Sequence, residues 1–221
     1  DKRPKEVPSV LGVYDNTNNN DKPTFVTNRM INQMPFLDAV IKESMRLYPV
    51  APFVVRKLSQ DITVTDKKTS TTSATTTATT NTTATTTLPQ NAMACLWIYG
   101  LHHHPDYWKQ PEDFVPERWL LDDDNDPNKD AGISNGCYMP FAVGPRNCLG
   151  QPLAQWILRS LLARILQRYR VQDARILTRS DSKTTTKKKR PDPQWRKDMQ
   201  AGFTVLPRGG VHLVVEERSK L

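Results

Sequence analysis

Apolar residues recur at helical spacing in two segments of the chain. Over residues 36–48 they fall at every third or fourth position, and Pro49 excludes the helical conformation for the residue before it. Over residues 151–169 the same spacing runs from Ala154 to Tyr169, with the arginines largely off the apolar stripe. We therefore expect helices over 36–48 and 151–169, each with one apolar face.

Shorter apolar runs that are rich in β-branched and aromatic residues predict strands. They lie at 53–56, 61–64 and 93–98, and a further pair of runs flanks Gly209-Gly210 within 203–215. Two glycines between such runs are typical of a hairpin turn, so we expect a C-terminal β-hairpin over 203–215. Together these elements predict a mainly α fold with a small β region.

A threonine-rich tract occupies residues 69–87, where 13 of 19 residues are Thr. It has no apolar periodicity that could offset the entropy of ordering, so we expect a low-complexity insertion at the tip of a hairpin. The acidic segment 122–130 and the basic, polar segment 178–196 are expected to be solvated loops. The segment 105–121 is rich in Pro and Trp and is expected to be irregular.

The net charge of +8 is a property that many nucleic-acid-binding proteins share. In this chain the basic residues form no single stripe and are not interleaved with aromatic residues. The densest basic run, 187–190, lies inside a polar loop. We therefore expect no nucleic-acid partner.

The cysteines number three and form no Cys-x-x-Cys pair. An odd count without paired spacing predicts neither a disulfide framework nor a zinc site. No apolar run reaches the length that a membrane-spanning helix needs. The chemistry of the cysteines therefore depends on the local sequence around each of them.

Cys148 stands immediately before the second predicted helix. The unpaired N–H groups and the dipole of a helix N-terminus stabilise an anion, so a cysteine at this place is favoured as the thiolate. Gly144 and Gly150 flank it and permit both unusual backbone geometry and the close approach of a flat ligand. A buried structural cysteine in a turn would explain Cys95 or Cys137 well, but it does not explain this combination.

Two further residues of the segment 141–150 suit a haem. Arg146 supplies a fixed cation for a carboxylate, and Phe141 can shield one side of the Cys148 sulfur. An anionic, planar, metal-bearing ligand fits all of these features, and haem b (iron protoporphyrin IX) with Cys148 as the axial iron ligand is such a group. The residues expected to bind the cofactor in this segment are Cys148, Arg146, Phe141, Gly144 and Gly150.

The segment 141–150 resembles the cysteine-ligand loop of the cytochrome P-450 family, because it matches the pattern Phe-x-x-Gly-x-Arg-x-Cys-x-Gly at every fixed position. Residues 43–46 resemble the family's Glu-x-x-Arg helix, and residues 116–119 resemble its Pro-Glu-Arg-aromatic stretch. The resemblance implies that residues 1–221 are a partial cytochrome P-450 domain from the C-terminal part of the fold. Pro145 in the loop makes the chain more similar to eukaryotic membrane-bound members than to soluble bacterial ones.

Taken alone, a Glu–Arg pair three residues apart on a helix is usually a surface contact worth about 0.3 kcal/mol. The resemblance implies instead that Glu43, Arg46 and Arg118 form a buried structural triad needed for haem incorporation. It also implies that Arg56 contacts a haem propionate. Residues 100–105, which include three adjacent histidines at 102–104, resemble the family's Leu-His-x-x-Pro segment, so we expect a structural role for the histidines rather than zinc binding.

The function that the resemblance implies is that of a haem-thiolate monooxygenase. Such an enzyme would insert one oxygen atom of dioxygen into a small lipophilic substrate, with electrons from a reductase that docks on the basic face near Cys148. The family's long distal helix is missing from this chain, so we expect no catalytic acid or base in it. We also expect the chain alone to bind haem weakly and to be inactive. In the full-length protein, a preceding segment is expected to hold the enzyme on the cytosolic face of the endoplasmic reticulum membrane.

Two alternatives remain open. One is a haem-thiolate isomerase or dehydratase that acts without dioxygen, although the intact spacing of 141–150 argues mildly against it, since such relatives tend to carry altered loops. The other is a truncated product that binds no haem. The Thr-rich tract favours this second alternative, and the undamaged motifs oppose it. The sequence upstream of Asp1 would discriminate among these hypotheses.

Overall fold

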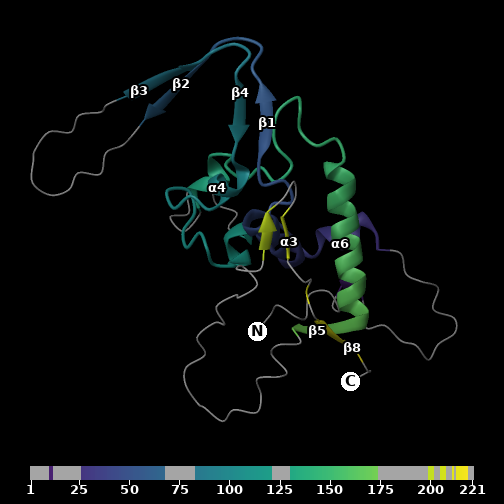
Figure 1. The fold of residues 1–221 in the computed structure, drawn as a ribbon. Helices are drawn as coiled ribbons and strands as arrows, with labels where there is room; N and C mark the ends of the chain where they lie inside the picture. The colour runs from purple at the N-terminus through teal and green to yellow at the C-terminus, as the bar shows by residue number, and fades with distance from the viewer. Residues whose placement is uncertain are drawn as a thin grey trace, which may run out of the picture. The chain divides into compact units, whose positions relative to one another are not determined.

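A computed structural model describes the parts of the chain that hold most of the predicted elements. The described residues are 10–11, 26–67, 83–120, 130–173, 199–201, 205–207, 211 and 213–218. The chain divides into two units, one of residues 53–97 and one of residues 1–52 with 98–221, and each is described by itself. Figure 1 shows the elements of both units.

Three helices build the core of the larger unit (Figure 1). Helix α2 spans Asn28–Asn32, α3 spans Pro35–Leu47, and α6 spans Gln151–Arg168. Pro35 stands in the first turn of α3, where the missing backbone N–H has no partner to lose. The helices predicted at 36–48 and 151–169 are thus present, and each ends one residue earlier than expected.

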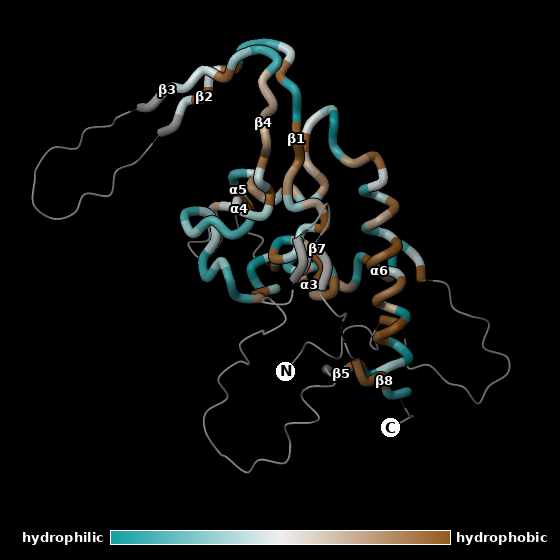
Figure 2. Tube along the Cα trace, in the orientation of Figure 1, coloured by the Kyte–Doolittle hydropathy of each residue, from teal (hydrophilic) through white to brown (hydrophobic). Residues whose placement is uncertain are grey.

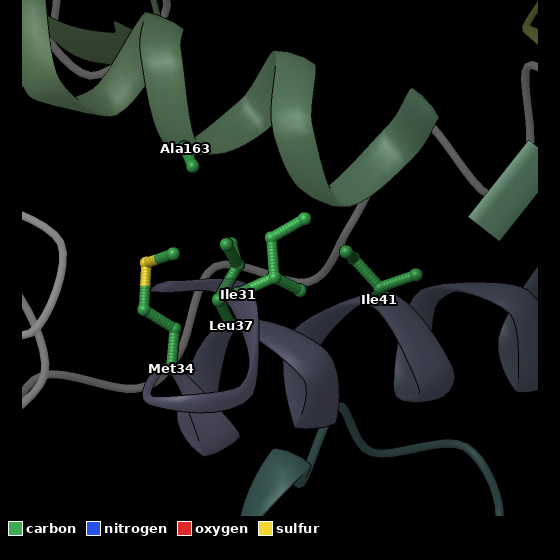
Figure 3. Packing of buried hydrophobic residues seen from close by; sticks show 5 residues of the cluster. All are labelled: Ile31, Met34, Leu37, Ile41 and Ala163. Carbon is green, nitrogen blue, oxygen red and sulfur yellow. The ribbon is translucent and has the colours of Figure 1, made fainter. Parts of the chain in front are cut away.

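The apolar core of this unit lies where α2 and α3 meet α6 (Figure 3). Its buried members are Ile31, Met34, Leu37, Ile41 and Ala163. Ala163 is fully buried, and its small side chain allows α6 to approach α3 closely. Arg159 of α6 also forms an ion pair with Asp38 of α3. Packing and charge therefore hold α6 against the helix that contains the Glu-x-x-Arg motif.

Much of the apolar stripe on α6 is exposed, and Figure 2 shows hydrophobic residues along the length of this helix. Ile157, Leu158 and Leu161 expose 46%, 37% and 55% of their surface, whereas Ala163 and Gln167 are buried. Leu162 of the same stripe packs against the core, so only part of the predicted stripe faces it. Helical spacing shows which side chains share a face, but it does not show which element covers that face.

Three short helices complete the larger unit. Helix α4 spans Ile98–His102, the 3-10 helix η2 spans Pro116–Leu120, and α5 spans Ala131–Ser134. The segment 105–121, predicted to be irregular, contains η2 and is anchored by Trp108, which is buried. Gly132 of α5 lies so close to the Trp108 ring that a Cβ on it would be 2.5 Å from the ring atom Cε2. Glycine is therefore required where α5 contacts this segment.

The smaller unit consists of two antiparallel pairs of strands. Strand β1 (Val54–Lys57) pairs with β4 (Met93–Leu96), and β2 (Ile62–Lys67) pairs with β3 (Thr83–Leu88). The prediction that the whole tract 69–87 is an unstructured tip is therefore wrong for residues 83–87. Threonine is β-branched and fits a pleated strand even where no apolar alternation marks it. Residues 69–82 lie outside the described residues.

Strands near the C-terminus pair differently from the prediction. Strand β5 (Tyr169–Asp173) pairs with β8 (Leu213–Glu217), and β6 (Met199–Ala201) pairs with β7 (Val205–Pro207). The hairpin predicted over 203–215 is therefore wrong, because its two arms pair with other strands. Apolar alternation predicts that a segment is extended, but it does not select the partner. Gly209-Gly210 lies outside the described residues.

The described elements are mainly helical with a small β region, as predicted from the sequence pattern. Among the described residues, no helix is both long enough and apolar enough to cross a membrane.

Candidate functional site

Residues 141–150, here called the cysteine loop, lead into the N-terminus of α6. Two backbone hydrogen bonds shape the loop: Cys148 N–H donates to Phe141 O over 2.9 Å, and Asn147 N–H donates to Gly144 O over 3.1 Å. Gly144 has a φ of +80°, which disfavours any residue with a side chain. Cys148 O accepts from the first residue of α6 over 3.2 Å. The loop therefore holds the cysteine at the start of the helix.

Cys148 and the residues beside it are exposed, and two of these neighbours are large and apolar. Cys148 is an exposed free cysteine. Leu149 and Val143 beside it expose 96% and 60% of their surface. A Cβ built on Gly150 would lie 3.9 Å from Cys148 Sγ and would meet nothing nearer. An exposed cysteine with apolar neighbours fits a haem, because a cysteine sulfur can bind haem iron and the ring is apolar.

The other residues predicted to bind the cofactor lie in two places. Phe141 is half-buried at the start of the cysteine loop, and Arg146 is exposed within it. Arg56 lies on β1 in the smaller unit and donates from Nη1 to Val55 O over 2.9 Å. The contacts of Arg146 and Arg56 with haem propionates stay predictions.

Glu43 and Arg46 form a fully buried ion pair on one face of α3. Arg46 donates from Nε to Glu43 Oε2 over 3.0 Å and from Nη2 to Glu43 Oε1 over 2.9 Å. Its remaining hydrogen bonds go to the backbone carbonyls of His102, Pro111 and Asp113. A bidentate pair with every further donor bonded is the arrangement in which buried charges are tolerated.

Arg118 of η2 binds this pair from the other side. It donates from Nε to Glu43 Oε1 over 3.2 Å and from Nη2 to Lys109 O over 3.0 Å, and its Nη1 binds Asp130. The structure thus brings Glu43, Arg46 and Arg118 together, with Glu43 between the two arginines. Trp119, next to Arg118, also donates from Nε1 to Glu43 Oε2 over 3.0 Å.

Asp130 is a fourth charged member of this group. It is 2% exposed, binds Arg118, and accepts the backbone N–H of Lys109. The prediction that 122–130 is a solvated loop is therefore wrong for Asp130, while residues 121–129 lie outside the described part of the chain. The composition of an acidic segment cannot show that one of its carboxylates is buried against a guanidinium. We call Glu43, Arg46, Arg118 and Asp130 the buried ion cluster.

The buried ion cluster is electrically balanced, with two carboxylates and two guanidiniums. Burial alone would raise the pKa of Glu43, but the hydrogen bonds and charge of Arg46, the Val115 N–H and the charge of Arg118 outweigh it. The pKa of Glu43 therefore lies below its ordinary value, and the side chain is a carboxylate at neutral pH.

His102 connects the buried ion cluster to the cysteine loop, a connection that the sequence motifs do not reveal. Its side chain is fully buried. Nδ1 lies 3.1 Å from Arg46 O, and Nε2 accepts the N–H of Met139 over 3.0 Å. The neighbouring His103, which directly follows α4, bonds instead to Tyr99 O of that helix. The structural role expected for the histidines is thus filled at His102 by hydrogen bonds at both of its ring nitrogens.

The family model for cytochrome P450 matches residues 14–193 of the chain. The chain belongs to the cytochrome P450 family. Human cytochrome P450 4F12 is 34% identical over 138 residues, which are 62% of this chain and 22% of that protein. Rat cytochrome P450 4A14 is 33% identical over 165 residues, which are 75% of this chain and 26% of that protein.

A taurochenodeoxycholic 6 alpha-hydroxylase from pig is 29% identical over 190 residues, which are 86% of this cytochrome P450 chain and 29% of that protein. The chain therefore spans roughly a quarter of the length of the curated relatives that it matches. Membership confirms the family predicted from the three motifs and the predicted fold class, mainly α with a small β region. It also implies the cofactor, because cytochromes P450 hold haem through a cysteine thiolate.

Proposed function

We propose that the chain forms the haem-thiolate side of a monooxygenase, which inserts one oxygen atom of dioxygen into a small lipophilic substrate. Electrons would come from a reductase that docks beside Cys148. The observation that supports this most strongly is the exposed Cys148 thiol at the start of α6, inside a complete cysteine-ligand motif. Thiolate ligation of a haem iron favours cleavage of the O–O bond, on which monooxygenation depends.

In this proposal the residues of the cysteine loop bind and orient the cofactor. Cys148 supplies the sulfur ligand from its place at the start of α6. Gly144 and Gly150 keep side chains away from the ring. Arg146 pairs with a propionate, with Arg56 as a second candidate, and Phe141 shields the sulfur from water.

The buried ion cluster has a structural role in the same proposal. Glu43 is a carboxylate at neutral pH whose two oxygens accept hydrogen bonds from two arginines, Trp119 and Val115. It therefore has no proton to donate and is poorly placed to accept one. We assign it to holding the elements that present Cys148, not to proton transfer. The endoplasmic reticulum location and the membrane association stay predictions.

The proposal is tested by the reduced carbonyl complex of the haem-loaded protein, expressed from its whole reading frame. The native protein should show the strongly red-shifted Soret band of thiolate ligation. Cys148→His should move the band to a position typical of imidazole ligation. Cys95→Ser is the matched control, because Cys95 is also an exposed free cysteine, and it should leave the band unchanged. An unchanged spectrum in Cys148→His would refute the ligand assignment.

A further inference from the structure

His102 uses both of its ring nitrogens in a fully buried environment. Met139 N–H can only donate, so Nε2 of His102 must be the acceptor of that 3.0 Å bond. The proton of the neutral ring therefore stays on Nδ1, which donates to Arg46 O over 3.1 Å. The geometry thus specifies one tautomer of a neutral imidazole.

The acceptor for Nδ1 is a carbonyl that needs a partner. Arg46 lies in the last turn of α3, where backbone carbonyls have no helical N–H to accept. The guanidinium of Arg46 in turn bonds to His102 O over 2.8 Å. His102 and Arg46 are therefore joined twice, once through each side chain.

The donor to Nε2, Met139, lies two residues before the cysteine loop. Met139 O accepts Ala142 N–H over 3.0 Å, which forms the turn that leads into the loop. Phe141, inside this turn, accepts the N–H of Cys148. The ring of Tyr138 stacks on the His102 ring, with centroids 5.5 Å apart and planes at 25°. The position of His102 thus fixes the backbone from which the cysteine loop starts.

We propose that His102 is a positioning residue that fixes the cysteine loop relative to α3, through acceptance of the Met139 N–H by Nε2. This inference rests on the proposed haem-thiolate function. Burial, chiefly, and the charge of Arg46 lower the pKa of His102 to about 4, so the ring is neutral and Nε2 can accept at physiological pH. Without the acceptor, Met139 N–H is left unpaired at a part-buried position, and the loop is free to shift and carry Cys148 away from the iron.

Two substitutions separate the two nitrogens of His102. In His102→Gln the side-chain amide reaches the position of Nε2, so its oxygen can accept Met139 N–H. In His102→Asn the shorter amide reaches only the position of Nδ1 and can donate to Arg46 O, so the loop contact is lost. His103→Gln is the matched control, because the His103 ring bonds to Tyr99 O of α4 and not to Met139.

The experiment measures haem content and the ratio of thiolate-ligated to non-thiolate carbonyl complex in the haem-loaded protein expressed from its whole reading frame. We expect His102→Gln and His103→Gln to stay close to the native ratio and His102→Asn to lower it roughly tenfold. A ratio in His102→Gln no higher than in His102→Asn overturns the inference, whether both are native-like or both fail to bind haem. Absence of the thiolate band in the native protein overturns the proposed function itself, and the inference with it.

Discussion

Glu43 and Arg118 lie 75 positions apart in the sequence and meet inside the protein, where Arg118 Nε donates to Glu43 Oε1 over 3.2 Å. Both side chains are almost fully buried. This contact joins α3 to η2, and Arg46 and Asp130 extend it on either side. Each charge in the group is compensated by another. The four side chains therefore depend on one another more strongly than the two partners of a surface ion pair do.

Removing either partner of the Glu43–Arg118 contact should impair assembly. Glu43→Ala leaves two buried guanidiniums with reduced compensation, and Arg118→Ala strands Asp130 and leaves Glu43 paired with Arg46 alone. Stranding a buried charge costs about 3–5 kcal/mol, a large share of the free energy of unfolding of a domain. We expect mostly haem-free, poorly folded protein from each variant, measured by haem content and melting temperature. Lys42→Ala, which removes a partly exposed pair with Asp38 on the same helix, is the control and should cost less than about 1 kcal/mol. Full haem content with loss of activity alone would contradict the structural role.

Asp130→Asn should destabilise the protein although it changes only one atom of the side chain. The amide would place a donor against either Arg118 or the backbone N–H of Lys109, both of which donate, and it would remove a compensating charge. We expect a loss of roughly 2–3 kcal/mol in the free energy of unfolding, measured with denaturant. Asp106→Asn is the control, because the Asp106 side chain is 80% exposed, and its effect should stay within about 0.5 kcal/mol. Equal effects of the two substitutions would show that Asp130 contributes no more than a surface carboxylate.

The sequence predicted the parts of the site that depend on local pattern. The helix that contains Glu43 and the helix that follows Cys148 follow from periodicity, whereas the meeting of Glu43 with Arg118 was implied by the family resemblance alone. The burial of Asp130 did not follow, because an acidic run looks solvated until its partner is known. The bond from His102 to Met139 did not follow either, since it joins segments 37 positions apart through one side chain and one backbone group.

Strand pairing was the least predictable feature, for a related reason. Residues 213–217 have the alternation of a strand, but their partner is β5, directly after α6, and not the neighbouring run at 203–206. Strand β3 was missed because its threonines show no apolar alternation, although they favour extended backbone. Local sequence thus specifies extended conformation, while the surrounding fold selects the partner.

Shortening the Thr-rich tract should be tolerated only as far as strand β3. Lys67 of β2 and Thr83 of β3 are paired residues, so replacement of 68–82 by Asn-Gly would close the two strands with a two-residue turn. We expect haem content and melting temperature to stay nearly native, because closure entropy depends only weakly on loop length. Replacement of 68–88 removes the partner of β2 and should lower the melting temperature. A large loss from the shorter replacement would show that residues 68–82 pack on another part of the protein.

His102 predicts how stability responds to mild acid. Its pKa is lowered to about 4 from an ordinary value of 6.5, chiefly by burial, with Arg46 and His103 as the facing charged or titratable groups. The unfolded chain therefore binds a proton in this window that the folded protein does not, so the free energy of unfolding falls as the pH drops from 6.5 towards 4. At about pH 5 the loss from this group is roughly 2 kcal/mol. Glu43, whose pKa is lowered from 4.5, adds its own loss mainly below about pH 5. We expect denaturant midpoints at about pH 7, 6 and 5 to fall steeply in the native protein and in His103→Gln, and to be flatter in His102→Gln. Parallel profiles for the three proteins would mean that His102 takes up no proton on unfolding in this range, and its neutral buried state would have to be abandoned.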